Sequence, residues 1–358
     1  MSKVIIDIKA IARQLGKKPT RDEYLELGNC SRYEVDKNHG SYTQALLQAG
    51  FGFHSQQANK EVNQVVQADF KKEVRDKCAE EILPYVGKYK KPHKNIITLV
   101  VGSDFHSHYV DMFCMKVFID TCKRMQPDYI VFNGDVTDFY EISSFSKDPS
   151  RRLTMQKELD FVENKMFKPV REACPNSEID FILGNHEWRL FKYLCTKAPE
   201  LADLRCLQFN ELFKLDKYEI NLVVKPNFLS AKKEGDLKNF KIYGDTYIVT
   251  HGTKTSKHCA MAELAEYGKS GCSGHVHKWQ KYSTRDLDGE KSWTSMGCMA
   301  KIMVGDDYVD GIGGKWGQGF QIAHIDTTAK LFLEESVHIK DGFALSSGRY
   351  YYDKKRSK

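Results

Sequence analysis

Long apolar runs are missing from this 358-residue chain. Its longest apolar stretches, 96–101 and 247–249, have the length of β-strands and are much shorter than the ~20 residues that a membrane-spanning helix needs. The N-terminal segment also lacks the apolar core of a signal peptide. We therefore expect an intracellular, cytoplasmic protein that makes no contact with a membrane.

Paired cysteine motifs are missing as well. The ten cysteines are scattered, and none of them forms a CxxC pair, which is typical of reduced thiols rather than of a disulfide framework. No low-complexity block occurs, and 41% apolar with 28% charged residues is an ordinary globular composition. The net charge of +6 permits an anionic substrate without requiring nucleic acid.

Residues 1–53 predict a small all-α module. Four short helices in about fifty residues have the size of a helix-turn-helix unit. Three helix starts are marked by a hydroxyl residue followed three positions later by Glu or Gln, which is the capping-box pattern. The three pairs are Thr20 with Glu23, Ser31 with Glu34, and Ser41 with Gln44.

The segments 18–24 (KPTRDEY) and 40–46 (GSYTQAL) resemble the homing-endonuclease-associated repeat. The resemblance implies contact with DNA. The basic residues that would then face phosphates are Arg13, Lys17, Lys18, Arg21, Arg32 and Lys37. Because six acidic residues in the same module nearly balance them, ordinary solvated surface charge is the alternative interpretation.

The rest of the chain predicts an α/β domain. Residues 54–95 are polar and suggest a connecting helix and linker, and residues 96–340 alternate between strand and helix patterns, which favours a layered α/β domain. Within it, residues 190–245 interrupt the alternation, so we expect an insertion that forms a lid or wall over the site, or structural filler. Residues 341–358 are expected to be a basic tail. The expected strands are 96–102, 129–132, 179–183 and 247–250, and the expected helices between the first three are 109–124 and 153–173. Within 190–245 the pattern is helical near 191–215 and strand-like near 218–224 and 239–243.

Five short motifs follow expected strands in a fixed order. They are 104–106 (DFH), 134–135 (GD), 184–187 (GNHE), 250–252 (THG) and 274–277 (GHVH). Strand ends of open α/β sheets meet at one edge, so these side chains are expected to converge. Together they offer two carboxylates, one amide oxygen and four imidazoles, with one histidine left over. That set suits two divalent cations sharing a carboxylate, an arrangement that clamps the attacking and leaving oxygens of a phosphoryl displacement. The sequence therefore predicts a hydrolase of phosphate esters.

The ordered motifs, over about residues 96–330, resemble the calcineurin-like metallophosphoesterase superfamily. The resemblance implies a layered β-sandwich flanked by helices and two ligand sets. The first metal would be held by Asp104, His106, Asp135 and His277, and the second by Asp135, Asn185, His251 and His275. Mixed imidazole and oxygen ligands suit Mn²⁺, Fe²⁺ or Zn²⁺, whereas Mg²⁺ prefers oxygen ligands alone. We expect two Mn²⁺ ions, with the other three as alternatives.

The remaining histidine, His186, is implied by the resemblance to assist the leaving oxygen, while a water bridging the two cations attacks. Glu187 is expected to be the carboxylate that orients His186, and Asp138 to support the ligands by hydrogen bonding. Three further side chains are candidates for contact with substrate, each with a plain structural alternative: Arg189, His108 and Lys254.

The whole chain is most similar to phage and prophage members of that superfamily, an impression carried by residues 139–151 and 315–320. We therefore predict a phosphodiesterase that acts on nucleic acid, specifically a DNA nuclease, in the host cytoplasm if a phage encodes it. The alternative is a phosphomonoesterase or small-nucleotide phosphodiesterase whose N-terminal module serves assembly or regulation. A third class, a non-catalytic scaffold, is disfavoured because all eight site positions are present. The sequence leaves the oligomeric state open.

Overall fold

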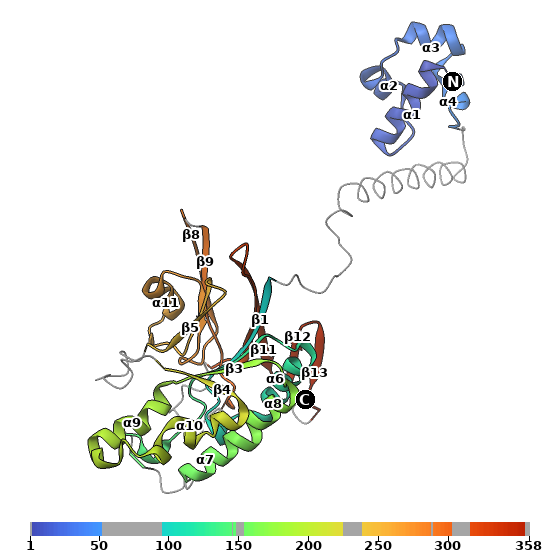
Figure 1. The fold of residues 1–358 in the computed structure, drawn as a ribbon. Helices are drawn as coiled ribbons and strands as arrows, with labels where there is room; N and C mark the ends of the chain where they lie inside the picture. Colours follow the sequence, from blue (N-terminus) through green and yellow to red (C-terminus); the bar gives the residue numbers. More distant parts are fainter. Residues whose placement is uncertain are drawn as a thin grey trace. The chain divides into compact units, whose positions relative to one another are not determined.

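The chain forms two compact units, 1–91 and 92–358 (Figure 1). The computed structural model describes residues 2–51, 95–144, 146–147, 154–224, 238–287, 289–302 and 316–354. The connecting helix and linker expected at 54–95 lie outside the described residues except for Asn95. No helix in the described part of the chain is both long and apolar enough to cross a membrane.

The N-terminal unit is the expected small helical module. Its helices are α1 (Lys3–Leu15), α2 (Arg21–Leu27), α3 (Arg32–His39) and α4 (Tyr42–Gln48). Thr20 and Ser31 start α2 and α3 with reciprocal capping boxes to Glu23 and Glu34, while the Ser41 hydroxyl accepts the amide of Gln44 at the start of α4. The four helices enclose one core, whose members are Val4, Ile8, Ile11, Ala12, Tyr24, Cys30, Val35, Tyr42, Ala45, Leu46, Ala49 and Phe51.

The larger unit contains an eight-stranded sheet in the order β13-β12-β11-β10-β1-β2-β3-β4. Strands β1 to β4 are parallel, and β10 joins β1 in antiparallel register. The strands are β1 (Ile96–Gly102), β2 (Tyr129–Asn133), β3 (Glu178–Ile182), β4 (Ile220–Val223), β10 (Gln318–Asp326), β11 (Leu331–Lys340), β12 (Phe343–Ser346) and β13 (Arg349–Tyr352). The sequence predicted β1 with these same bounds.

A second sheet has five strands in the order β5-β6-β7-β9-β8. They are β5 (Phe240–Tyr243), β6 (Tyr247–Thr250), β7 (Gly271–Ser273), β8 (Gln280–Asp286) and β9 (Gly289–Ser295). Strands β6, β7 and β9 are parallel, so the ends of β6 and β7 that carry the last two motifs lie at one edge.

The two sheets pack face to face. Leu99, Val101 and Val131 from the first sheet share a buried cluster with Val249 and Cys272 from the second. The opposite face of the first sheet packs against helices α6 (Met112–Met125), α7 (Met155–Val162) and α8 (Lys168–Ala173), while α11 (Cys259–Tyr267) covers the second sheet (Figure 1). The expected fold class, a layered α/β sandwich flanked by helices with a small all-α module, is confirmed.

Two segments are organised differently from the expectation. Residues 190–245 contribute a strand to each sheet, because β4 extends the first sheet beside β3 and β5 forms an edge of the second. The part of this segment before β4 begins with the end of α9 (Asn185–Lys197) and includes α10 (Phe209–Leu212). The expected tail at 341–358 instead contributes the β12–β13 hairpin, whose two-residue turn has positive φ at Ser347 and Gly348, the geometry that suits a tight hairpin.

Candidate dinuclear metal centre

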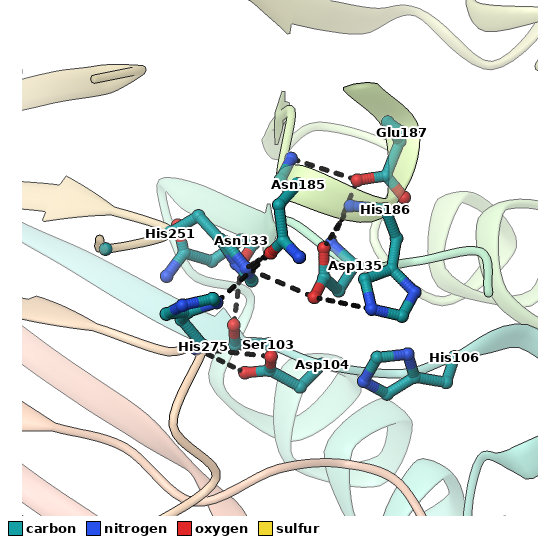
Figure 2. A network of polar contacts seen from close by, with 12 residues as sticks. Ser103, Asp104, His106, Asn133, Asp135, Asn185, His186, Glu187, His251 and His275 are labelled. Atoms are coloured by element: carbon teal, nitrogen blue, oxygen red, sulfur yellow. Dashed lines mark hydrogen bonds and ion pairs between the residues drawn. The ribbon is translucent and has the colours of Figure 1, made fainter. Parts of the chain in front are cut away.

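The five motifs meet at the ends of the strands that precede them. Asp104 and His106 follow β1, and Asp135 follows β2. Asn185 opens α9 directly after β3. From the second sheet, His251 follows β6, and the pair His275 and His277 follows β7. Figure 2 labels all of these side chains except His277 and shows the labelled ones gathered around Asp135.

The backbone at this site is unusual. Five of the seven candidate ligands have left-handed φ values, which non-glycine residues adopt rarely and at a cost of about 1 kcal/mol each. They are Asp104 (56°), His106 (51°), Asp135 (50°), His275 (70°) and His277 (56°). Such strain concentrates where a chain must aim functional side chains, so the backbone marks the site independently of the side-chain chemistry.

The glycines inside the motifs allow this close approach. A Cβ atom on Gly134 would overlap the ring of His251, and one on Gly184 would overlap the Asp135 carboxylate. A Cβ on Gly274 would overlap the Asp104 carboxylate and the Ser103 hydroxyl. The glycines therefore let the strand ends of the two sheets touch at the ligands.

The first group of possible ligands is Asp104, His106 and His277, all buried. His277 Nε2 lies 3.0 Å from Asp104 Oδ1 and 3.2 Å from His106 Nε2. Two ring nitrogens facing each other at this distance need a proton or a cation between them, because neutral imidazole offers a lone pair at its acceptor nitrogen. Burial lowers the pKa of His277 against the opposing effect of Asp104, which favours the neutral form that binds metal.

The second group is Asp135, His251 and His275, joined by Asn185. Asn185 Oδ1 lies 3.0 Å from His251 Nε2 and 3.1 Å from His275 Nδ1, and His251 Nε2 lies 3.2 Å from Asp135 Oδ2. Asp135 also groups with His106 and His186. Asp135 therefore lies between the second group and His106 of the first group, and its role as a shared carboxylate stays a prediction.

The electrostatics fit bound cations. Burial lowers the pKa of His251, but the neighbouring Asp135 carboxylate outweighs burial and raises it to about 10. Burial and the nearby His251 lower the pKa of His275 to about 4. Without a metal, the buried carboxylates thus hold a proton on one imidazole and leave its neighbour neutral. A divalent cation would replace that proton and satisfy the same carboxylates, so the residues fit two metal ions.

His186 lies beside this cluster, with Nε2 3.7 Å from Asp135 Oδ2. Its Nδ1 is 3.0 Å from the carbonyl oxygen of Asp138 and 3.1 Å from the Asp138 carboxylate. Arg189 donates from Nη2 to His186 Nε2 at 2.8 Å and from Nη1 to the Asp138 carbonyl at 2.8 Å. Asp138 therefore supports the site as expected, and Arg189 lies next to the histidine that the resemblance implies is catalytic.

The predicted contact between Glu187 and His186 is wrong. The buried Glu187 carboxylate instead accepts the backbone amides of Asp135, Thr137 and Gly184 at 2.9 to 3.0 Å. Consecutive helix residues point about 100° apart, so Glu187 faces the β2 loop while His186 faces Asp138. Glu187 holds the loop that carries Asp135, and Asp138 orients His186.

Two weaker candidates lie away from the ligand groups. The ring of His108 contacts Ser107 Oγ at 2.9 Å and packs against Tyr109 with ring centres 4.0 Å apart. The Lys254 ammonium pairs with Glu266 Oε2 at 3.2 Å. Both side chains have structural partners, so the expectation that they contact substrate gains no support.

In the N-terminal unit, two of the basic candidates form ion pairs inside the module. Lys17 Nζ lies 2.6 Å from Glu23 Oε1, and Arg32 Nε lies 3.7 Å from Asp36 Oδ2. Arg21 is exposed and Lys18 is half-buried. Exposed pairs of this kind are weak and open readily to an anionic partner, so DNA contact by these residues stays a prediction.

Sequence reasoning missed Asn133 and Glu158. The Asn133 carbonyl lies 2.9 Å from His251 Nδ1, and its side chain donates to the Thr250 carbonyl at 2.7 Å. A proton held on Nδ1 leaves Nε2 free for metal. Glu158 accepts the amides of Asp138 and Phe139, and burial together with Asp138 raises its pKa to about 7. Asn133 had a usable signal, because it directly precedes the Gly-Asp motif, whereas Glu158 had none.

Known proteins agree with part of this picture. The model of the homing endonuclease associated repeat matches residues 2–52. The resemblance of the N-terminal module is confirmed. Two phage proteins, each named "Gene 54 protein", from Mycobacterium phages L5 and D29, are 25% identical to the chain over 242 residues, or 64% of this chain and 89% of each relative. The expected similarity to phage proteins is therefore also confirmed.

A solved structure of a dimetal phosphatase from Danio rerio is similar at 12% identity, over 67% of this chain and 95% of that one, with a TM-score of 0.35. The structure of TT1561 from Thermus thermophilus matches at 10% identity, over 67% and 99% of the two chains, with a TM-score of 0.29.

Proposed function

We propose that this chain is a phosphodiesterase that uses two divalent metal ions, Mn²⁺ by preference, to hydrolyse DNA. The observation that carries the proposal is a set of three adjoining ligand groups, two of which contain Asp135 and one of which contains His186, with Arg189 donating to His186. When bound, two cations supply Lewis-acid stabilisation of a phosphoryl group and lower the pKa of water. The residues that would hold them are Asp104, His106, Asp135 and His277 for one, and Asp135, Asn185, His251 and His275 for the other.

His186 and Arg189 would act on the substrate. As the structure stands, Arg189 donates to His186 Nε2. A phosphodiester entering beside Asp135 would attract the guanidinium, which binds phosphate in a fork-like geometry. His186 Nε2 would then be free to carry a proton to the leaving oxygen, and the Asp138 carboxylate at Nδ1 would stabilise the imidazolium that donates this proton and becomes neutral as it does so.

The N-terminal module is the reason to propose DNA as the substrate. Its match to the homing endonuclease associated repeat supports contact with nucleic acid. We propose that Lys17, Lys18, Arg21 and Arg32 bind phosphates and hold the catalytic unit near DNA, in the cytoplasm of a phage-infected host. Deleting residues 2–51 should then weaken DNA binding while turnover of a small diester is preserved.

The deciding experiment compares bis(p-nitrophenyl) phosphate with p-nitrophenyl phosphate as substrates of the full chain in Mn²⁺. We expect turnover of the diester and a fall of ~10²–10⁴-fold in the His186→Ala variant, the usual contribution of a general acid. His324→Ala is the matched control, because His324 lies on β10 opposite Thr98, near the start of β1 and away from the strand end that carries Asp104 and His106, and it should retain activity.

Metal binding is measured separately by calorimetry. The wild type and His186→Ala should both bind two Mn²⁺ ions, Asp135→Asn should lose both, and His277→Ala should lose one. Turnover of the monoester alone would contradict the proposal in favour of a phosphomonoesterase. If the chain neither binds Mn²⁺ nor hydrolyses either substrate, the remaining interpretation is the non-catalytic scaffold.

A further inference from the structure

A cleft of about 590 Å³ opens next to the candidate metal centre and follows helix α9. The helix residues that line it lie three or four positions apart, which places them on one face. They are Asn185, Trp188, Arg189, Lys192, Tyr193, Thr196 and Lys197. The cleft thus starts at a candidate metal ligand and continues for about 18 Å along the helix, at 1.5 Å per residue.

The lining of the cleft is basic. Arg189, Lys192 and Lys197 lie on the helix side, and Lys147 and Glu141 lie on the opposite wall. Four cations therefore face one acid. The Lys147 ammonium donates to the carbonyls of Tyr140 and Ser143 at 2.5 and 2.7 Å. Burial and the nearby Arg189 lower the pKa of Lys147, and an anion bound between the two cations would offset their repulsion.

The spacing of the cations exceeds the size of one phosphate. Lys197 is eight residues after Arg189 on α9, which is about 12 Å along the axis. A phosphomonoester beside Asp135 can reach Arg189 but not Lys197. A chain of several phosphates can reach both, as well as Lys192 between them.

Aromatic groups accompany the cations. The Tyr193 side chain is 42% exposed, and the Lys192 ammonium lies 5.0 Å from the centre of the Trp188 ring. Alternating basic and aromatic side chains in a groove are how proteins hold single-stranded nucleic acid, because every base offers a face for stacking. The cleft has the volume of a small-molecule pocket, too little for a double helix.

We infer that this cleft binds the single-stranded nucleic acid that flanks the scissile phosphodiester, with Lys192 and Lys197 contacting successive phosphates and Tyr193 stacking on a base. The inference rests on the proposed phosphodiesterase function and narrows its substrate to a strand longer than a dinucleotide. On this inference, the residues of α9 that line the cleft select long strands as substrates, whereas the candidate metal centre hydrolyses the phosphodiester bond.

The test compares two double variants of the full chain that remove equal charge. Lys192→Gln with Lys197→Gln changes the cleft, while Lys116→Gln with Lys123→Gln changes exposed positions on α6, again with one lysine in the last turn. Hydrolysis of bis(p-nitrophenyl) phosphate should be equal in both. For a single-stranded oligodeoxynucleotide, the cleft variant should have a KM about tenfold higher than the wild type. The reason is that two exposed ionic contacts are lost, each of which contributes about 0.7 kcal/mol.

Binding of a fluorescent single strand, measured by anisotropy in EDTA, tests the same surface without catalysis. Two lost phosphate contacts should flatten the slope of log affinity against log salt by about 1.4. Tyr193→Ala should weaken binding about tenfold, whereas Tyr193→Phe should restore it because the ring that stacks is retained.

The outcomes separate the two claims. If no diester is hydrolysed but the cleft variant loses affinity for the strand, the proposed function fails and the binding surface stands. If the diester is hydrolysed and the cleft variant behaves like the α6 control, the inference is overturned and the function stands. An equal loss of affinity for a duplex of the same sequence would overturn the assignment of a single strand.

Discussion

The two sheets of the larger unit contribute different chemistry to one site. The first sheet supplies both carboxylates, the amide of Asn185 and one imidazole, while the second supplies His251, His275 and His277 and no carboxylate. Neither ligand group is complete on one sheet, because His277 joins Asp104 and His106, and His251 and His275 join Asp135. The site therefore needs residues from both sheets. It lies at the seam, by which we mean the place where the strand ends of the two sheets meet.

The two sides are also held differently. On the first sheet, Glu187 fixes the Asp135 loop through backbone amides. The second sheet is positioned by contacts across the seam: the His275 amide donates to the Asp104 carboxylate at 3.0 Å, and Asn133 bonds to the Thr250 carbonyl at 2.7 Å. Substitutions within the first sheet should therefore displace the carboxylate ligands. The imidazole ligands of the second sheet should instead be displaced by substitutions that separate the two sheets.

The strongest way to break this arrangement is Gly274→Ala. The added methyl group would overlap Ser103 and Asp104 and push the second sheet's histidines away from the first sheet. We expect a loss of about 3 kcal/mol in unfolding free energy, as in an overpacked core, and loss of both metal sites. Thermal unfolding and Mn²⁺ calorimetry measure the two effects.

Gly268→Ala is the control for that substitution. Gly268 has a positive φ of 64° but open space around its Cβ position, so alanine there should cost only about 1 kcal/mol of backbone strain and leave metal binding intact. Retained binding of two Mn²⁺ ions by Gly274→Ala would refute the idea that docking across the seam builds the site.

A smaller effect is expected for Glu187→Gln on the first sheet. Glutamine has one acceptor oxygen, so buried amides at Asp135, Thr137 or Gly184 would lose their partner at a cost of about 2 kcal/mol. Affinity for Mn²⁺ should fall about tenfold, the usual effect of losing support behind a ligand. Glu172→Gln, at an exposed pair on α8, is the control for charge.

This variant also separates the two roles considered for Glu187. A slower reaction with unchanged stability and unchanged metal affinity would restore the role of orienting His186 and contradict the contacts described above.

The smallest effect is expected far from the seam, at Glu163. This carboxylate accepts from Lys214, Lys217 and Tyr218 at 2.5 to 2.8 Å, and the two lysines lower its pKa to about 2. Because both lysines are half exposed or more, Glu163→Gln should cost only about 1 kcal/mol near neutral pH. Turnover of bis(p-nitrophenyl) phosphate should stay unchanged.

The pH dependence of this effect has a definite sign. The pKa of Glu163 is lower in the folded chain than its ordinary 4.5, so its stabilisation is complete above that value and is lost as the pH falls toward 2. Urea unfolding of the wild type and Glu163→Gln should differ near neutral pH, and the difference should shrink below about pH 4.5 and vanish only as the pH falls to about 2. A difference that grows on acidification would show that the lysines do not stabilise the ionised carboxylate.

Short sequence patterns predicted the strands and helices whose positions depend mainly on residues that are close in the sequence. β1 and β6 have the predicted bounds, because each is an apolar run that ends at a motif. The candidate ligands lie close together, since each follows a strand and the carboxyl ends of β1, β2 and β3 in the first sheet meet those of β6 and β7 in the second. Capping boxes located α2 and α3 for the same local reason.

Features set by distant parts of the chain were not predictable in this way. β4 has four residues, and its place beside β3 depends on the sheet as a whole. The β12–β13 hairpin did carry a signal, a Ser-Gly turn between alternating apolar residues, but the basic residues that follow suggested a tail. Glu187 was assigned by its adjacency to His186, whereas helix geometry turns the two side chains apart.

The left-handed backbone at five candidate ligands has a consequence for the evolution of this chain. Glycine at Asp104, His106, Asp135, His275 or His277 would relieve the local strain, by about 1 kcal/mol at each position. This relief opposes the contacts that each side chain makes, such as that of Asp104 with the His275 amide. Where those contacts contribute less than the strain, stability and ligand placement act in opposite directions, and a lineage in which metal binding is no longer selected would be expected to drift there first.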